Sequence, residues 1–219
     1  PAGAVALVVL LLEALAVVLA PAVLGLKADI IDISNMLARP GSGHLLGTDS
    51  LGRDVLSRLL FGGRVSLGIA AAGTFFGCVV GGLLCLVAVF RGGWVDAIVN
   101  RVLEVLLAFP TLVLGLFVLA MLGSSISNVV LAISLTFVPR ANRILRPAFL
   151  AVKSEDYVTA AVGTGCSDTR IMLRHILPNA FAPMLVLLSI NLGVAIIIEA
   201  SLGFLGLGQQ PPFPEWGAM

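Results

Sequence analysis

Three glutamates lie in or beside long apolar stretches, and they are the residues whose chemistry stands out most. Glu13, Glu104 and Glu199 would each place a carboxylate at membrane depth, which is costly and usually means that the group faces a bundle interior or an aqueous cavity. Glu199 is the best candidate for lining a pathway, and a structural hydrogen-bonding role fits it equally well. Arg101 precedes Glu104 by three residues, so we expect these two to pair on one helix face.

The residue groupings that enzymes use are missing from the sequence. His44 and His175 lie in polar segments on opposite expected sides of a membrane, and no serine–histidine or metal-ligand constellation falls within one apolar stretch. The cysteines number three and are scattered, which argues against a disulfide framework. No Gly-x-x-x-x-Gly-Lys-Ser/Thr sequence for phosphate binding occurs. We predict no catalytic residue, no metal site and no ATP hydrolysis in this chain.

The composition shows which kind of protein must position these groups. Of 219 residues, 59% are hydrophobic and 11% charged, against about 45–50% and about 25% in soluble domains. These values exclude a soluble globular domain, a disordered chain and a coiled coil. The net charge of +1 gives no reason to expect a nucleic-acid partner. The sequence therefore predicts an all-α polytopic membrane protein, in contact with lipid.

Five segments are long and apolar enough to cross a bilayer, which takes about 20 residues of helix. They cover roughly residues 4–26, 66–90, 103–122, 126–145 and 181–206. Between the second and the third, Gly92-Gly93 with flanking arginines predicts a short turn at 91–101. Pro110 predicts a kink in the third. The chain starts without methionine and stops at Met219 soon after the fifth span, so we expect it to be part of a longer protein.

The spans suggest a division into three parts. Residues 1–26 form a first transmembrane helix, 27–65 an extracytoplasmic connector, and 66–219 a core domain with a long cytoplasmic loop at 140–180. Eight basic residues fall in the segments expected inside and five in the connector outside, which supports this orientation. The 140–180 loop contains six of the eight.

Gly73, Gly77 and Gly81 form two overlapping GxxxG units in the second span. Small residues at every fourth position form a groove into which another helix can pack closely. We interpret them as a helix-packing surface; ordinary glycine richness is the alternative.

The 140–180 loop is the most informative region. Ser154 predicts a helix N-cap, followed by the acidic Glu155 and Asp156. Gly163 and Gly165 predict the end of that helix, and a second helix begins near Ser167 and closes at Pro178. A DNA-binding helix-turn-helix shares this pattern only in shape, because the loop is tethered by spans on both sides and lacks a strongly basic helix.

This stretch resembles the EAA loop of prokaryotic ABC importer permeases, which reads Glu-Ala-Ala, three residues, Gly, nine residues, Ile-x-Leu-Pro. Thr159, Ala160 and Ala161 occupy the triplet, Gly165 the glycine, and His175 to Pro178 the ending. Thr159 and His175 depart from the consensus. The sequence His175-Ile176-Leu177-Pro178-Asn179 fits the peptide/nickel branch of the family.

Two further segments resemble the same branch, with the closest similarity to the second permease subunit of dipeptide and oligopeptide importers. Residues 44–54, read from His44 to Asp54, resemble the stretch ahead of its second span, and 201–217 the stretch after its fifth. The resemblance implies a type I ABC importer permease fold in the prokaryotic inner membrane. Five spans are visible of an expected six, the sixth following Met219.

The resemblance also implies functional roles for several residues. The EAA helix would dock on a cytoplasmic ATPase, and ATP with Mg²⁺ would act only there. The other implied partners are a second homologous permease subunit and an extracytoplasmic substrate-binding protein. The expected ATPase-coupling residues are Glu155, Asp156, Tyr157, Thr159, Ala160, Ala161, Gly165, Arg170, His175 and Pro178.

Asp49, Arg53 and Asp54 are expected to face the binding protein, and a self-contained network that orders the connector is the alternative. The resemblance predicts import of di- or oligopeptides. Nickel chelates or other small solutes are alternatives within the family. An ion-coupled secondary transporter is the less favoured class, because no internal repeat is visible.

Overall fold

The computed structural model describes residues 2–23, 25–41, 43–209 and 212–219, with side chains in the first helix described at 8 and 11–21. The described residues form helices joined by turns, with one isolated β-bridge between Thr48 and Asp54. The chain divides into two compact units, residues 1–69 with 199–219 and residues 70–198.

The first unit contains α1 (Ala2–Val23), the connector, the start of α2 (Val55–Arg91), the end of α9 (Phe181–Phe204) and the closing residues 205–219. Short 3-10 turns lie at η1 (Ile33–Asn35) and η3 (Trp216–Ala218). Arg64 of α2 donates from Nε to the carbonyl of Val17 at 2.9 Å. This bond joins α1 to α2, the two helices that flank the connector.

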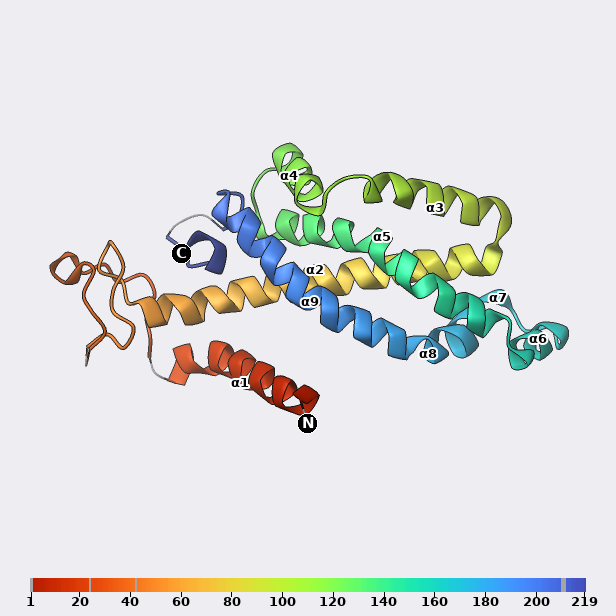
Figure 1. Ribbon diagram of the computed structural model, residues 1–219, viewed down its shortest axis with the longest axis horizontal. Helices are drawn as coiled ribbons and strands as arrows, with labels where there is room; N and C mark the ends of the chain where they lie inside the picture. Colours follow the sequence, from red (N-terminus) through yellow and green to blue (C-terminus); the bar gives the residue numbers. More distant parts are fainter. Residues whose placement is uncertain (1, 24, 42, 210–211) are drawn as a thin grey trace. The chain divides into compact units, whose positions relative to one another are not determined.

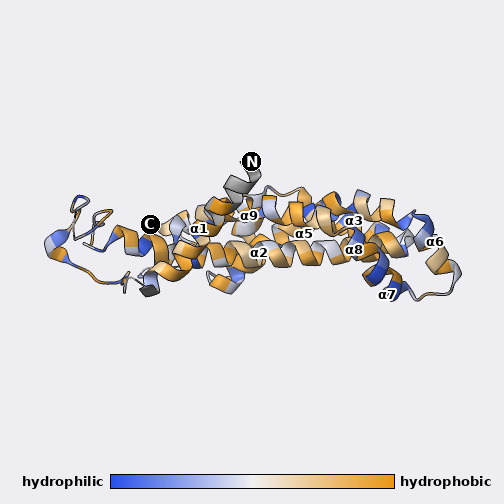
Figure 2. Cartoon of the chain, turned by 90° about the horizontal axis from the view of Figure 1, so that it is seen from below, coloured by the Kyte–Doolittle hydropathy of each residue, from blue (hydrophilic) through white to orange (hydrophobic). Residues whose placement is uncertain are grey.

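The second unit consists of the remainder of α2 and α9 with α3 (Gly93–Leu107), α4 (Thr111–Leu122), α5 (Ile126–Lys153) and the short helices that follow (Figure 1). These are α6 (Asp156–Gly163), α7 (Asp168–Ile171), the π-helical turn η2 (Met172–Ile176) and α8 (Leu177–Asn179). Colouring by hydropathy shows a largely hydrophobic α2 and stretches of hydrophilic colour near α6 and α7 (Figure 2).

Two described helices, α2 and α9, are long and apolar enough to cross a membrane, and a third span results if α3 and α4 count as one. The axes of α3 and α4 differ by 93° across a short break that contains Pro110, so the predicted kink is a sharp bend. The helix α3 starts at Gly93, which corrects the prediction that 91–101 is a turn. The chain turns at Gly92 and Gly93, whose positive φ values of 63° and 50° suit glycine.

The helix α5 extends well beyond the predicted fourth span and ends at Lys153, with Pro139 and Pro147 inside it. Its C-terminal part contains Arg140, Arg143, Arg146 and Lys153, which explains why it is a poorer match to a membrane span than α2. The ammonium of Lys153 donates to the carbonyls of Val89 at 2.7 Å and Phe90 at 3.1 Å. Cations suit the unpaired carbonyls at a helix C-terminus, so this contact fixes the end of α5 to the end of α2.

Candidate functional site

The residues with the most specific sequence pattern, 154–180, lie at the end of α5 and in the four short helical elements that follow it. Ser154 terminates α5, and Glu155 takes the N-cap position of α6 without a side-chain hydrogen bond to the helix. The predicted N-cap at Ser154 is therefore wrong by one residue. Its hydroxyl donates backwards to the carbonyl of Ala151 at 2.8 Å.

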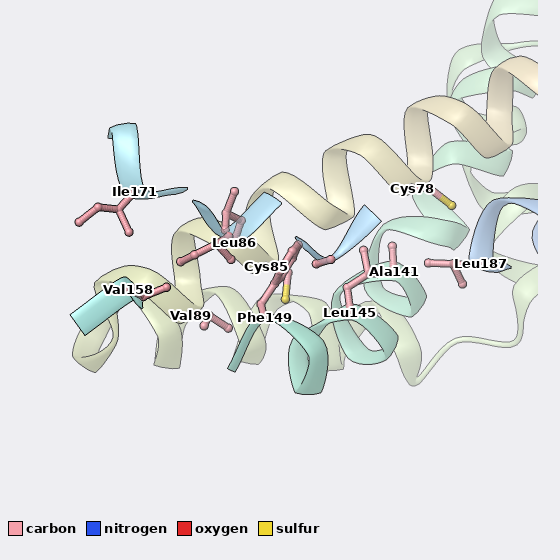
Figure 3. Close-up of a cluster of buried hydrophobic side chains, with 12 residues drawn as sticks. Cys78, Cys85, Leu86, Val89, Ala141, Leu145, Phe149, Val158, Ile171 and Leu187 are labelled. Atoms are coloured by element: carbon pink, nitrogen blue, oxygen red, sulfur yellow. The ribbon is translucent and has the colours of Figure 1, made fainter. Parts of the chain in front are cut away.

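One face of α6 is anchored in the apolar core of the second unit. Val158 is buried with Ile171 of α7 and Ile176 of η2, in the same cluster as Leu86 of α2 and Phe149 of α5 (Figure 3). Ala161, three residues after Val158, packs against this cluster. The spacing matches one face of a helix, so α6 is held to the transmembrane helices by small and branched apolar side chains.

The opposite face of α6 is exposed and narrow. Thr159, Ala160 and Gly163 are exposed there. Tyr157 and Val162 are also exposed, but Val162 is four residues after Val158 and so lies on the edge of the anchored face. The structure thus separates the two alanines of the motif: Ala160 points to the surface, and Ala161 faces the core. The motif alone predicts a single slim surface that contains both alanines. It does not show which alanine faces inward, because this depends on which side of the helix meets the core.

The turn after α6 requires a left-handed residue, and Gly165 supplies it with φ of 77°. The N–H of Gly165 donates to the carbonyl of Val162 at 3.0 Å, and that of Cys166 to Ala161 at 3.1 Å. The predicted role of Gly165 at this helix end is confirmed. Gly163 is the last helical residue, without a positive φ, so it does not share that role.

The remaining motif residues lie in the second half of the loop. The rings of Tyr157 and His175 lie with their centroids 6.4 Å apart, which brings α6 next to η2. Arg170, Glu155 and Asp156 are exposed. Pro178 was expected to close a helix, and the helical run that starts at Asp168 ends one residue after it, at Asn179 of α8.

A polar network that the sequence analysis missed connects α3 to α5. Arg146 donates to both carboxylate oxygens of Asp96, at 2.5 and 2.7 Å. Asn100 donates to Asp96 at 2.8 Å and accepts from Asn142 at 3.2 Å. The i, i+4 spacing of Asp96 and Asn100 was a usable signal, but it fell in a segment that was expected to be a turn. A cavity of about 320 Å³ lies beside this network, lined by Asn100, Leu103, Glu104, Leu107, Pro139, Asn142, Arg143 and Arg146.

The three glycines of α2 lie against α5. A Cβ at Gly73 would stand 2.7 Å from Ile133 Cγ2, and one at Gly77 the same distance from Phe137 Cβ. At Gly81 it would meet the carbonyl oxygen of Val138. The groove that these glycines form is therefore filled by α5 of the same chain.

In the connector, the three charged residues expected to face a partner bind mainly to the connector itself. Asp49 accepts from Arg53 Nε at 2.7 Å and from the backbone N–H of Leu51 and of Arg53. Asp54 accepts from the N–H and the hydroxyl of Ser57 at 2.7 Å, and its Oδ1 lies 3.0 Å from His44 Nδ1.

Both aspartates are held ionised by these bonds. Partial burial raises the pKa of Asp49, but the hydrogen bonds from Arg53 and Leu51 outweigh it and leave the pKa below its usual value. The same balance, between burial and the hydrogen bonds from Ser57 and His44, lowers the pKa of Asp54. The geometry favours the ordering network over a surface of free charges, and contact with a binding protein stays a prediction.

The three glutamates of the apolar stretches differ in their surroundings. Glu104 is exposed and lies 3.5 Å from Arg101, as the spacing predicted. Glu13 is exposed in α1, while Glu199 is completely buried in the first unit. Its pathway role stays a prediction. Among the described residues, His, Cys, Asp and Glu do not gather in threes in the way that metal ligands would.

Comparison with known proteins identifies relatives for most of the chain. Residues 73–219 match the family described as binding-protein-dependent transport system inner membrane component. The glutathione transport system permease protein GsiD of Pectobacterium atrosepticum is 42% identical over 191 residues, 87% of this chain and 64% of that protein. The dipeptide transport system permease protein DppC of Alkalihalophilus pseudofirmus is 39% identical over 186 residues, 85% of this chain and 61% of that protein.

The chain thus spans less than two thirds of the length of these two relatives. A putative peptide transport system permease protein of Brucella suis is 39% identical over 98% of this chain and 72% of its own length. Among solved structures, an amino acid ABC transporter with histidines matches with a TM-score of 0.51 at 19% identity, over 74% of this chain and 76% of that one. At this identity the match concerns the fold alone.

Proposed function

The chain belongs to the family of binding-protein-dependent transport system inner membrane components, and from this premise we propose that it is a permease subunit of an ABC importer for short peptides. It forms part of the translocation pathway, while a separate cytoplasmic ATPase binds ATP with Mg²⁺. The names of the relatives, which refer to glutathione, dipeptide and peptide transport, support peptides as the cargo.

The observation that carries this proposal is the two-sided construction of α6. Val158 and Ala161 attach one face of the helix to the core that contains α2, α5 and α9. The other face offers Thr159, Ala160 and Gly163 without a large side chain between them. A groove on the ATPase can approach such a face closely, and a displacement of α6 is passed to the transmembrane helices because interlocked cores do not deform continuously.

In this proposal the fold is that of a type I importer permease, with five spans in the present chain. They are α1, α2, the bent pair α3 and α4, the first half of α5, and α9. The loop 140–180 lies in the cytoplasm, and the connector 27–65 lies outside with the residues after Gln209, where a substrate-binding protein delivers cargo. A second permease subunit completes the pathway. The proposal includes the predicted division of the chain into a first span that ends at residue 26, a connector that ends at residue 65, and a core domain after it.

The test is reconstitution of the full-length subunit with its co-encoded partners in liposomes. We expect radiolabelled di- and tripeptides to enter only when ATP is present on the side of the ATPase and the binding protein on the other. A free amino acid and a nickel chelate serve as competing cargoes. Uptake driven by a proton gradient without ATP would contradict the proposal, and competition by the nickel chelate alone would contradict the cargo.

A further inference from the structure

The closing residues of the chain pack tightly against helices of their own unit. The backbone N–H of Trp216 donates to the hydroxyl of Ser66 at 3.2 Å, and its indole Nε1 donates to the carbonyl of Leu59 at 2.9 Å. A Cβ at Gly63 would stand 2.7 Å from the Trp216 ring. Residues 212–219, which we call the closing segment, therefore contact α2 through Trp216, with Pro214 and Glu215 buried and the segment's ends exposed.

Two carboxyl groups meet beneath this segment. Glu199, near the end of α9, and Glu215, in the closing segment, are both 0% exposed. The Glu199 carboxyl interacts with the neighbouring Glu215 carboxyl and Ser66 hydroxyl. The Glu215 carboxyl is enclosed by backbone, since a Cβ at Gly203 would stand 2.9 Å from its Oε1. Its Oε2 accepts the backbone N–H of Gln209.

The hydrogen bonds of this pair are incomplete. Among the described residues, neither oxygen of Glu199 has a partner in good hydrogen-bonding geometry, and neither does Oε1 of Glu215. An ionised carboxylate can only accept hydrogen bonds. Two ionised carboxylates facing each other therefore form no bond, and a proton between them supplies the missing donor.

No cation among the described residues compensates for two negative charges here. Glu199 is the only charged residue in the sequence of α9. On α2, Arg58 pairs with Asp49 at 3.5 Å, and Arg64 donates to the carbonyls of Val17 and Val18 of α1. Ser66 contributes an uncharged hydroxyl, and Glu215 is the charged group of the closing segment that faces Glu199. Burying two like charges without a compensating partner is strongly unfavourable.

We propose that Glu199 and Glu215 form a buried proton-binding site in which one proton is shared between the two carboxyl groups. The acid–carboxylate hydrogen bond fastens the closing segment to α9. A proton fits where the packing leaves little room, because it adds no volume between the carboxyl oxygens and the backbone of Gly203. Loss of the proton leaves two adjacent buried negative charges and releases the segment. The site is independent of the proposed function, since it depends on these contacts alone.

The first test is infrared difference spectroscopy on the full-length subunit at neutral pH, in H₂O and D₂O. The wild type should show the carbonyl-stretch band of a buried protonated carboxylic acid, and both Glu199→Gln and Glu215→Gln should lose it. Glutamine keeps the shape and supplies an amide donor, so each variant retains the fold. The matched control is Glu155→Gln, at an exposed glutamate, which should leave the band unchanged.

The second test follows the release of the segment. Trp94 is 85% exposed, and in a Trp94→Phe background Trp216 is the single tryptophan of the sequence. Its emission should shift to the red as the pH is raised from neutral to alkaline, and should return on acidification. With Glu199→Gln added, the emission maximum of Trp216 should stay at its short-wavelength value over the whole pH range. The variant has no shared carboxyl proton that could dissociate.

Several results would overturn the proposal. An infrared band that is absent from the wild type, or that survives in both glutamine variants, shows that no proton is shared. Equal red shifts with and without Glu199→Gln show that the pair does not fasten the segment, and so does a wild-type emission that never shifts. If a chelator releases the segment at constant pH and a divalent cation restores it, the occupant is a metal ion.

Discussion

The guanidinium of Arg146 binds both carboxylate oxygens of Asp96, at 2.5 and 2.7 Å, and so joins α5 to α3 across 50 residues of sequence. Both side chains are partly exposed, with 30% and 23% of their surface accessible. Two parallel bonds of this kind give a defined geometry that a single ammonium cannot reproduce. The pair fixes the part of α5 that leads into α6.

We predict that this pair contributes measurably to stability. Arg146→Lys and Asp96→Asn should each lower the unfolding midpoint in detergent, and a double-mutant cycle should give a coupling of about 0.5–3 kcal/mol. The exposed pair Arg101 and Glu104, 3.5 Å apart, is the control, with an expected coupling of about 0–1 kcal/mol. Equal coupling energies for the two pairs would show that the Arg146 contact is a surface ion pair of no special importance.

The contact between α2 and α5 should be intolerant of added volume. Gly77→Val places a branched side chain where a Cβ would already stand 2.7 Å from Phe137, and overpacking of this kind costs about 1–3 kcal/mol. The yield of folded protein and its thermal midpoint should both fall. Gly68→Val, on the same helix with nothing within 4 Å of its Cβ, should be tolerated. Equal effects of the two variants would contradict the contact.

The turn after α6 should be sensitive to backbone conformation rather than to space. A Cβ at Gly165 meets nothing within 4 Å, but φ is 77°, and a left-handed conformation costs an ordinary L-residue about 1–2 kcal/mol. Gly165→Val should therefore reduce ATP-dependent uptake while insertion into the membrane stays normal. Gly165→Asn, which tolerates this conformation better, should retain more uptake. Unchanged uptake by Gly165→Val would count against a coupling role for the turn.

The connector should lose order in acid. The folded-state pKa values of Asp49 and Asp54 are lowered, so each contributes stability above its unfolded pKa of about 3.9, and that contribution is lost as the pH falls through the folded value. The protection factors of residues 43–58 in hydrogen exchange, which are rates corrected for the intrinsic pH dependence of the amide, should be high at neutral pH and fall below about pH 4. The Asp49→Asn/Asp54→Asn double variant should have lower protection factors at neutral pH, with little further change in acid. If the wild-type protection factors are the same at both pH values, the aspartate network does not order the connector.

Much of the fold follows from the sequence because apolar length, proline and glycine act locally. The apolar stretches coincide with helices, Pro110 with the bend, and Gly165 with the left-handed turn. The errors also have physical causes. The segment 91–101 was predicted as a turn from its glycines and arginines, but after Gly92 its residues form the first turns of α3, and Asp96 and Asn100 face α5.

The candidate site was only partly predictable for a related reason. A motif fixes which residues are adjacent along the chain, whereas the orientation of a helix depends on distant partners. Ala160 and Ala161 were therefore treated alike, although Val158 and the core cluster turn only Ala161 inward. The pairing of Glu199 with Glu215 also depends on the tertiary fold. The two residues are 16 positions apart in the sequence, and only the folded chain brings their carboxyl groups together.

The most direct test of the central claim, that the exposed face of α6 docks on a partner ATPase, is site-specific photo-crosslinking in the assembled transporter. A photoreactive amino acid at position 160, on the exposed face, should capture the ATPase subunit. The same group in place of Val162, also exposed, gives the width of the contact, and in place of Glu104, outside the loop, it serves as the negative control. We predict an ATPase crosslink from position 160 and none from position 104. Absence of the crosslink at both 160 and 162, in a transporter that still imports peptide, would contradict the account.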